Sequence, residues 1–527
     1  MTKKRYLILY SVSLVFFFVI SLMQKTPGYM DASYYFATGR QLAGGNGVTE
    51  PFIWNYLSNP QSIPTPAFTY WMPLSVLLAA LGMWMFNSDS FFAARTLFIL
   101  LAAFLPTLTV YFVSQKTSQK VYIALAVLFS LLCGAYLPYL TITETFTPFF
   151  VLGALFLIVA GILLDGTKIS GRRNLLYLLL GIITGLMHLT RADGILWLAG
   201  GFLVVIMARP TIGNYKRITG KTLIYLFFLV IGYLCVMAGW FSRNILIFGS
   251  FFPEGSNLAI WFIQYDDLFM YPSSVLTFQR LINTGWPVIL KSRCVAGLAN
   301  LQTLLGVNGN VVLLPFMMVG AWRERKNQLN QLVLLLIALL FCLMTFVFPY
   351  AGYRGGFLHS MSAFQIYLWS LTIIGIEATV HWTILKLNWV EKKSRTLFAT
   401  VLILGITAMT CITFVNKVQP LNGTWDQEYA NYERLAEYLQ GIAGGEQFSV
   451  MINDSPGYYG ATQREAIQLS SGSILKVKEL LHDFDIDYLV IDVDAPVSLK
   501  SLYENPGSQN GLILVDHLNG YFIYAGE

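Results

Sequence analysis

The chain has 527 residues, of which 56% are hydrophobic and only 12% are charged, against roughly 25% charged residues in soluble domains. This composition indicates a membrane protein and excludes an ordinary soluble domain. The net charge of +6 lies in short Lys and Arg clusters between apolar stretches, so we expect no nucleic-acid partner. Five widely spaced cysteines without CxxC spacing argue against a disulfide framework or a zinc site.

Apolar runs that cross a bilayer contain about 20 residues. The first such run follows the basic N-terminus and ends near Met23 without a small-residue cleavage site, so we expect a retained span rather than a signal peptide. Ten later runs bring the predicted number of spans to about eleven. They lie near residues 91–113, 119–137, 146–164, 174–190, 194–208, 221–240, 310–322, 329–349, 361–385 and 396–416.

One further apolar stretch, Phe68 to Phe86, decides the orientation of every later span. If it lies along the outer surface, all five basic clusters that follow become cytoplasmic, as the excess of Lys and Arg in cytoplasmic loops requires. We therefore interpret residues 68–86 as a juxtamembrane helix. The clusters are Lys116/Lys120, Lys168/Arg172/Arg173, Lys216/Arg217/Lys221, Arg323/Arg325/Lys326 and Lys386/Lys392/Lys393/Arg395.

This topology predicts an all-α polytopic membrane protein of about 11 transmembrane helices with a small extracytoplasmic α/β domain at its C-terminal end. Residues 1–416 form the transmembrane domain, with external loops at 25–90 and 241–309, and residues 417–527 form the soluble domain. The pattern of residues 417–527 predicts helices at 429–439 and 474–482, strands at 448–452 and 488–492, and a hairpin at 512–524. The expected location is the plasma membrane.

Charged side chains gather at the outer ends of the spans and are almost absent from their middles, which argues against an ion-coupled transporter. Asp31 follows the first span and is our candidate for a catalytic base that takes a proton from an acceptor hydroxyl. Its alternative role is the N-cap of a short helix that runs to Leu42. Glu50 is the reserve candidate for the base.

Three external arginines, Arg191, Arg243 and Arg354, are candidates for binding a donor phosphate, because a guanidinium group donates two parallel hydrogen bonds. Each of them alone is also explained by snorkelling to lipid headgroups. Four more residues are candidates for lining the same cleft, although a single interfacial histidine is more often structural. These are Glu144, His188, Asp193 and His359.

Three stretches resemble the GT-C fold glycosyltransferases, in particular bacterial members related to protein mannosyltransferases and to lipid A aminoarabinose transferase. They run from Pro27 to Leu57, with Gly-Tyr-Met-Asp-Ala-Ser-Tyr-Tyr at its start, from His188 to Gly194, and from Arg243 to Pro253. The resemblance implies a first-loop acidic residue, which Asp31 matches by position. Many relatives pair two adjacent acidic residues there, whereas Ala32 and Ser33 follow Asp31, so a metal-binding Asp pair is not supported.

The resemblance further implies a polyprenyl-phosphate-linked sugar as donor and a lipid, glycan or protein acceptor at the outer face of the membrane. No cofactor is firmly implied, and a divalent metal ion remains compatible with these residues. Two alternatives stay open at this point. One is a transporter or flippase for a lipid-linked glycan, although neither inverted repeats nor mid-membrane charges support it. The other is a noncatalytic scaffold whose terminal domain binds a partner.

Overall fold

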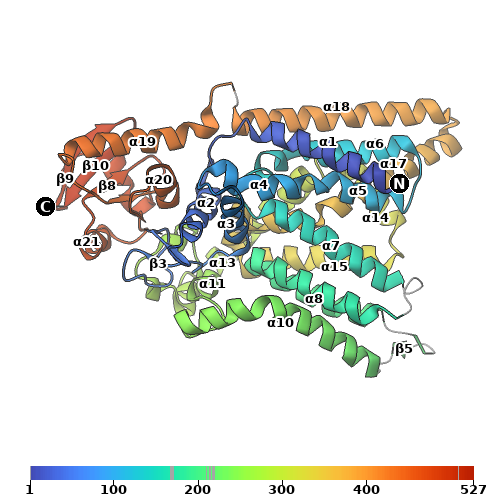
Figure 1. Ribbon diagram of the computed structural model, residues 1–527, viewed down its shortest axis with the longest axis horizontal. Coiled ribbons are helices and arrows are strands. Elements are labelled where there is room, and N and C mark those ends of the chain that lie inside the picture. Colours follow the sequence, from blue (N-terminus) through green and yellow to red (C-terminus); the bar gives the residue numbers. More distant parts are fainter. Residues whose placement is uncertain are drawn as a thin grey trace.

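The computed structural model describes residues 2–165, 171–208, 211–212, 215–216, 220–419, 421–508 and 510–526. Long helices form a bundle along the longest axis of the molecule, and a smaller part with a β-sheet lies at one end of it (Figure 1). The helices α2 (Met30–Ala43) and α3 (Leu74–Phe86) lie between the bundle and the sheet (Figure 1). The candidate functional site lies at this junction.

Eight spans among the described residues are long and apolar enough to cross a membrane. The span Pro349–Leu387 is the most deeply buried of them. The eight correspond to α1 (Lys3–Ser21), α4 with α5 (Phe91–Ala102 and Phe104–Ser114), α7 (Phe146–Asp165), α8 (Arg173–Thr190), α10 (Gly220–Phe248), α15 (Gln328–Cys342), α17 (Phe357–Leu387) and α18 (Glu391–Val418).

The other three predicted spans are helices too, but they are shorter than a full span. They are α6 (Lys120–Leu132), α9 (Ile195–Met207) and α14 (Leu314–Arg323). The α3 helix (Leu74–Phe86) begins six residues later than the stretch that starts at Phe68, because Pro73 precedes its first turn. With 13 residues it is too short to cross a bilayer by itself.

The two predicted external loops contain short elements. The first has α2 (Met30–Ala43) and the strands β1 (Thr49–Glu50), β2 (Phe52–Ile53) and β3 (Thr65–Pro66). The second has α11 (Glu254–Leu258), α12 (Phe278–Asn283) and α13 (Trp286–Gln302). Two more short strands, β4 (Thr211–Ile212) and β5 (Tyr215–Lys216), pair before α10, and α16 (Pro349–Ala351) precedes α17.

The C-terminal part confirms the predicted helices and strands and adds others that the sequence pattern did not reveal. The predicted elements are α19 (Thr424–Ile442), β6 (Val450–Ile452), α21 (Ile474–Asp483), β8 (Tyr488–Ile491), β9 (Leu512–Leu518) and β10 (Tyr521–Gly526). The added elements are α20 (Ser455–Thr462), β7 (Ala466–Gln468) and α22 (Lys500–Glu504).

The six-stranded sheet has the order β2-β7-β6-β8-β10-β9, so its first strand comes from the first of the two loops that the sequence predicts to be external. Phe52 and Ile53 pair in parallel with Ala466 and Ile467 of β7. Alternation along β6 sends Val450 and Ile452 to one core and Met451 to the other. Each face of the sheet is therefore covered, by α19 and α20 on one side and by α21 on the other.

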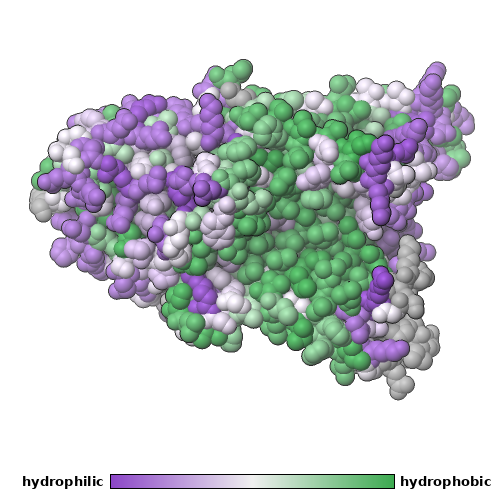
Figure 2. All heavy atoms as spheres, viewed as in Figure 1, coloured by the Kyte–Doolittle hydropathy of each residue, from purple (hydrophilic) through white to green (hydrophobic). Residues whose placement is uncertain are grey.

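The basic clusters meet at the end of the bundle that lies away from the sheet. Lys116 forms an ion pair with Glu324 at 2.6 Å, and Arg395 donates to Gln119 at 2.9 Å. A hydrophobic band separates this hydrophilic end from the hydrophilic C-terminal part on the face shown in Figure 2. The cluster residues Lys168 and Arg217 lie outside the described residues. This grouping of basic residues at one end is the arrangement that the predicted topology requires.

Cysteine accessibility will test which end faces the cytoplasm. With the five native cysteines replaced, a single cysteine at the exposed Ser118 should stay unlabelled by a membrane-impermeant reagent in intact cells, because we place it inside. A single cysteine at the exposed Ser501 in α22 should be labelled. Labelling of Ser118→Cys together with protection of Ser501→Cys would reverse the topology.

Candidate functional site

Asp31 lies in the first turn of α2, and it is not the N-cap. The N-cap position is Tyr29, and no side chain caps this helix. The alternative interpretation of Asp31 as a helix cap is therefore wrong. As the second residue of the helix, Asp31 is still near the positive end of the helix dipole, which favours a carboxylate there.

Glu144 approaches Asp31 from the segment that precedes α7. It is 1% exposed, and its carboxylate accepts hydrogen bonds from the backbone N–H and the hydroxyl of Thr145 at 2.6 and 2.7 Å. The Tyr29 hydroxyl donates to its other oxygen at 3.2 Å. Both oxygens of this buried carboxylate are thus fixed in position.

His359 completes a group of three with these carboxylates. Its Nδ1 lies 3.3 Å from Oε1 of Glu144 and 3.1 Å from the Thr145 hydroxyl, and its ring stacks on Phe146 at 3.9 Å. One potential ligand atom from each of Asp31, Glu144 and His359 lies within 4.8 Å of the other two. The sequence predicted all three residues for the cleft, but gave no reason to place them together.

Arg191 and Asp193 form an ion pair beside this group. The Nε of Arg191 lies 2.9 Å from Asp193, and Nη2 donates to the carbonyl of Gly356 at 3.4 Å. The Ser360 hydroxyl donates to the second oxygen of Asp193. Because Ser360 follows His359 directly in α17, the ion pair fixes the same helical turn that carries the histidine.

Arg354 lies in a break just before α17. The backbone leaves helical geometry at Arg354 and at Gly355, where φ is +123°, a conformation that glycine adopts without strain. The exposed Arg354 side chain lies over the Tyr265 ring at 4.2 Å. Tyr265 is also close enough to Asp31 for the two to interact electrostatically, so Arg354 lies near the rim of the Asp31 group.

Glu50 and Arg243 form a separate buried arrangement. Glu50 is 1% exposed and accepts hydrogen bonds from the Tyr34 hydroxyl at 2.5 Å and the Phe68 amide at 2.9 Å. Arg243 donates to the carbonyl of Ala67 and lies 5.5 Å from the Phe68 ring. These contacts hold the loop between α2 and α3 against α10, so the structure does not bring either residue into the group around Asp31.

His188 likewise has a local partner. Its Nδ1 lies 2.7 Å from the Tyr233 hydroxyl of α10, and the side chain is buried. This contact joins α8 to α10 and matches the structural role that an interfacial histidine usually has.

The pKa values of the two carboxyl groups around Asp31 are shifted from their usual range. Burial, and next the nearby charge of Glu144, raise the pKa of Asp31 to about 8, and Arg191 opposes this. Burial also disfavours the charge on Glu144, yet His359 and the Thr145 hydrogen bonds hold the pKa of Glu144 below its usual range. Two carboxyl groups in one site thus have pKa values pushed apart, which is characteristic of catalytic sites.

Two tyrosines that sequence reasoning missed also border the site. Burial raises the pKa of Tyr70 to about 12, and the charges of Arg191, Asp31 and Asp193 act on its phenol. Tyr29 donates directly to Glu144. Tyr29 is near Asp31 in the sequence, which is a signal for its place in the lining, whereas the sequence carries no such signal for Tyr70.

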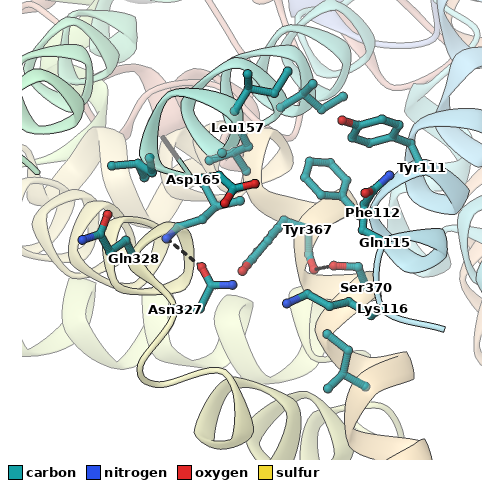
Figure 3. Close-up of a pocket in the computed structure, with 16 residues that line it drawn as sticks. Tyr111, Phe112, Gln115, Lys116, Leu157, Asp165, Asn327, Gln328, Tyr367 and Ser370 are labelled. Carbon is teal, nitrogen blue, oxygen red and sulfur yellow. Dashed lines mark hydrogen bonds between the residues drawn. The ribbon is translucent and has the colours of Figure 1, made fainter. Parts of the chain in front are cut away.

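A cavity of about 730 Å³ lies elsewhere, at the end of the bundle that carries the basic clusters (Figure 3). It is bounded by α5, α7, α15 and α17, with Lys116, Asp165 and Asn327 among its lining residues. None of the predicted site residues lines it. We therefore place the candidate site at the Asp31 group and not in this cavity.

No family model and no curated protein matches the sequence. Solved structures match the fold. ArnT from Cupriavidus metallidurans, bound to undecaprenyl phosphate, matches with a TM-score of 0.56 and 12% identity over 99% of this chain and 98% of that chain. The archaeal oligosaccharyltransferase AglB from Archaeoglobus fulgidus, in complex with an inhibitory peptide and a dolichol-phosphate, matches with a TM-score of 0.54 and 13% identity over 100% of this chain and 74% of that chain. The Archaeoglobus fulgidus oligosaccharyltransferase in complex with Zn and sulfate matches with a TM-score of 0.52 and 12% identity, over 98% of this chain and 73% of that chain.

The chain has the GT-C fold. The fold expected from the resemblance of three short sequence stretches is thereby confirmed. Identity of 12–13% establishes the fold alone, so the activity of this GT-C chain has to be argued from its own residues.

The possible ligand atoms of Asp31, Glu144 and His359 fit a divalent cation. Two carboxylate oxygens and one imidazole nitrogen are ligands that zinc and manganese accept, and three protein ligands leave a position open for a substrate oxygen. Burial, and next the negative charge of Glu144, raise the pKa of Asp31, and a bound cation would oppose both effects. The second carboxylate comes from Glu144 and not from a residue adjacent to Asp31. The lack of an adjacent Asp pair in the sequence therefore does not exclude a metal site here.

Metal binding gives a direct test of this group. Removing one charged ligand by Glu144→Gln should weaken Mn²⁺ binding to the purified protein by about tenfold or more, ~1.4 kcal/mol, in titration calorimetry. Glu428→Gln in α19 changes a carboxylate outside the group and is the matched control. Equal Mn²⁺ affinity in the two variants would contradict the assignment.

Proposed function

We propose that the chain is a membrane glycosyltransferase that moves a sugar from a polyprenyl-phosphate donor to an acceptor, at the end of the bundle that faces the C-terminal domain. We place this end outside the cytoplasmic membrane. The observation that carries the proposal is the convergence of Asp31, Glu144 and His359, with Arg191 beside them, at that end of a GT-C fold.

Asp31 is the proposed base. In the transfer, the acceptor oxygen attacks the anomeric carbon of the sugar, the bond to the lipid phosphate breaks, and the acceptor proton must leave. A carboxylate whose pKa is near the working pH is an efficient general base, and the pKa of Asp31 is raised to about 8. His359 and the Thr145 hydrogen bonds favour the charged form of Glu144, so Asp31 is the carboxyl group of this pair whose pKa is raised.

The leaving lipid phosphate needs fixed positive charge. We assign this role first to Arg354, whose exposed guanidinium lies at the rim of the site over Tyr265, and then to Arg191, which shares its charge with Asp193. A divalent cation held by Asp31, Glu144 and His359 would add positive charge beside the phosphate. The ligands of the solved neighbours support this donor class, since ArnT was solved with undecaprenyl phosphate and AglB with a dolichol-phosphate.

The sharpest test of the proposed base is Asp31→Asn. The variant should lower the rate of sugar transfer by about 10²–10⁴-fold while the protein stays folded, because a general base contributes about that much. The measurement is release of free polyprenyl phosphate from a panel of polyprenyl-phosphate sugars. Glu50→Gln is measured in parallel: normal turnover of Asp31→Asn with loss in Glu50→Gln would move the base to Glu50.

Arginine-to-lysine exchanges test donor binding. Arg354→Lys should weaken binding of the polyprenyl phosphate about tenfold, because lysine keeps the charge but loses the paired N–H donors. Arg243→Lys should leave donor affinity unchanged and lower the Tm, since Arg243 packs against Phe68 and Trp240. Unchanged donor affinity in both Arg354→Lys and Arg191→Lys would contradict the assignment of phosphate binding to these two arginines.

A further inference from the structure

The first turn of α19 forms hydrogen bonds with the linker that connects α1 to α2. Oδ1 of Asp426 accepts three hydrogen bonds from this linker: from the Lys25 amide at 2.9 Å, the Thr26 amide at 2.8 Å and the Thr26 hydroxyl at 2.9 Å. Charged acceptors make the stronger hydrogen bonds of proteins. One carboxylate from the C-terminal domain therefore fixes two consecutive residues about 400 positions earlier in the chain.

Trp425 adds a second contact to the same linker. Its indole N–H donates to the Thr26 carbonyl at 2.9 Å. Its ring occupies the space beside Gly28, where an added Cβ would lie 2.1 Å from the indole. Gly28 also has φ of +86°, so only glycine fits here without strain.

Two residues that α19 contacts are close neighbours of Asp31, the proposed base. Tyr29 meets the Trp425 ring edge-on at 6.3 Å and donates to Glu144. Ser33, on the other side of Asp31, lies 3.0 Å from the Tyr429 hydroxyl of α19. Asp31 thus lies between two residues that α19 contacts.

The other end of the linker is anchored to the helix bundle. The Gln24 side chain donates to the Pro138 carbonyl at 2.8 Å, and its backbone carbonyl accepts from the buried Arg95. With Gln24 fixed in the bundle, residues 25 and 26 are the part of the linker whose backbone depends on Asp426.

We propose that Asp426 is a positioning residue for Asp31. This rests on the proposed function, in which Asp31 is the base. By holding Lys25 and Thr26, Asp426 sets the direction in which the chain enters α2, and so the place of the Asp31 carboxylate relative to Glu144 and His359. The C-terminal domain in this way helps to place the proposed catalytic base.

A kinetic comparison separates positioning from plain stabilisation. In the full-length protein, Asp426→Ala should lower kcat by about 10²-fold, the loss that a misplacement of about 1 Å can cause. The KM for the polyprenyl-phosphate sugar should change less than about twofold, because the arginines that bind the phosphate are untouched. Asp426→Asn should recover most of the rate, since its amide oxygen accepts the same bonds.

Tyr432→Phe is the matched control. It removes a hydrogen bond to Glu428 within α19 and does not reach the linker, so kcat per folded molecule should stay at the wild-type value. Wild-type kcat in Asp426→Ala, or an equal loss in Tyr432→Phe, would overturn the positioning role.

Hydrogen exchange provides a readout that needs no sugar transfer. In Asp426→Ala, amides of residues 25–33 should exchange faster while the sheet strands keep their protection, and Asp426→Asn should restore slow exchange. Unchanged exchange in residues 25–33 would overturn the proposal. If the wild-type protein transferred no sugar from any donor, the proposed function would fall, whereas exchange would still decide whether Asp426 holds the linker.

Discussion

The close approach of Asp31 and Glu144 is the constraint on which the site depends. Two carboxylates whose ligand atoms lie within 4.8 Å of each other repel strongly where water is largely excluded. Two effects in the site reduce this repulsion. His359 and Thr145 stabilise the charge on Glu144, while burial and next the charge of Glu144 raise the pKa of Asp31 to about 8. The site is thus prepared for a base and for added positive charge.

Meeting this constraint requires three parts of the chain that are distant in sequence. Asp31 comes from the start of α2, Glu144 from the segment before α7, and His359 from the first turn of α17. The break at Gly355 lets Arg354 face Tyr265 while the next turn of helix directs His359 to Glu144. A straight helix through this point would fix the rotation between these two side chains, because they are five residues apart in sequence.

Among its contacts with this arrangement, the C-terminal domain contributes a sheet neighbour for one strand and a helix that binds a linker. The strand β2 enters its sheet, and α19 holds the linker before Asp31. A two-residue strand has no alternating pattern, and a hydrogen bond between residues 26 and 426 leaves no local trace in sequence. The boundary near residue 417 therefore marks a change in composition, whereas the structure joins segments on both sides of it.

The sequence by itself determined the membrane class, the order of the long helices, the grouping of basic residues between spans and most C-terminal helices and strands. These follow from hydrophobic runs, charge and periodicity, which are local properties of the chain. It also supplied each member of the Asp31 group as a separate candidate. Only the tertiary structure decided that Glu144 and His359 join Asp31, that Glu50 and Arg243 pack elsewhere, and that Asp31 does not cap its helix. Distances between side chains on different helices depend on how those helices pack, and no single segment encodes that.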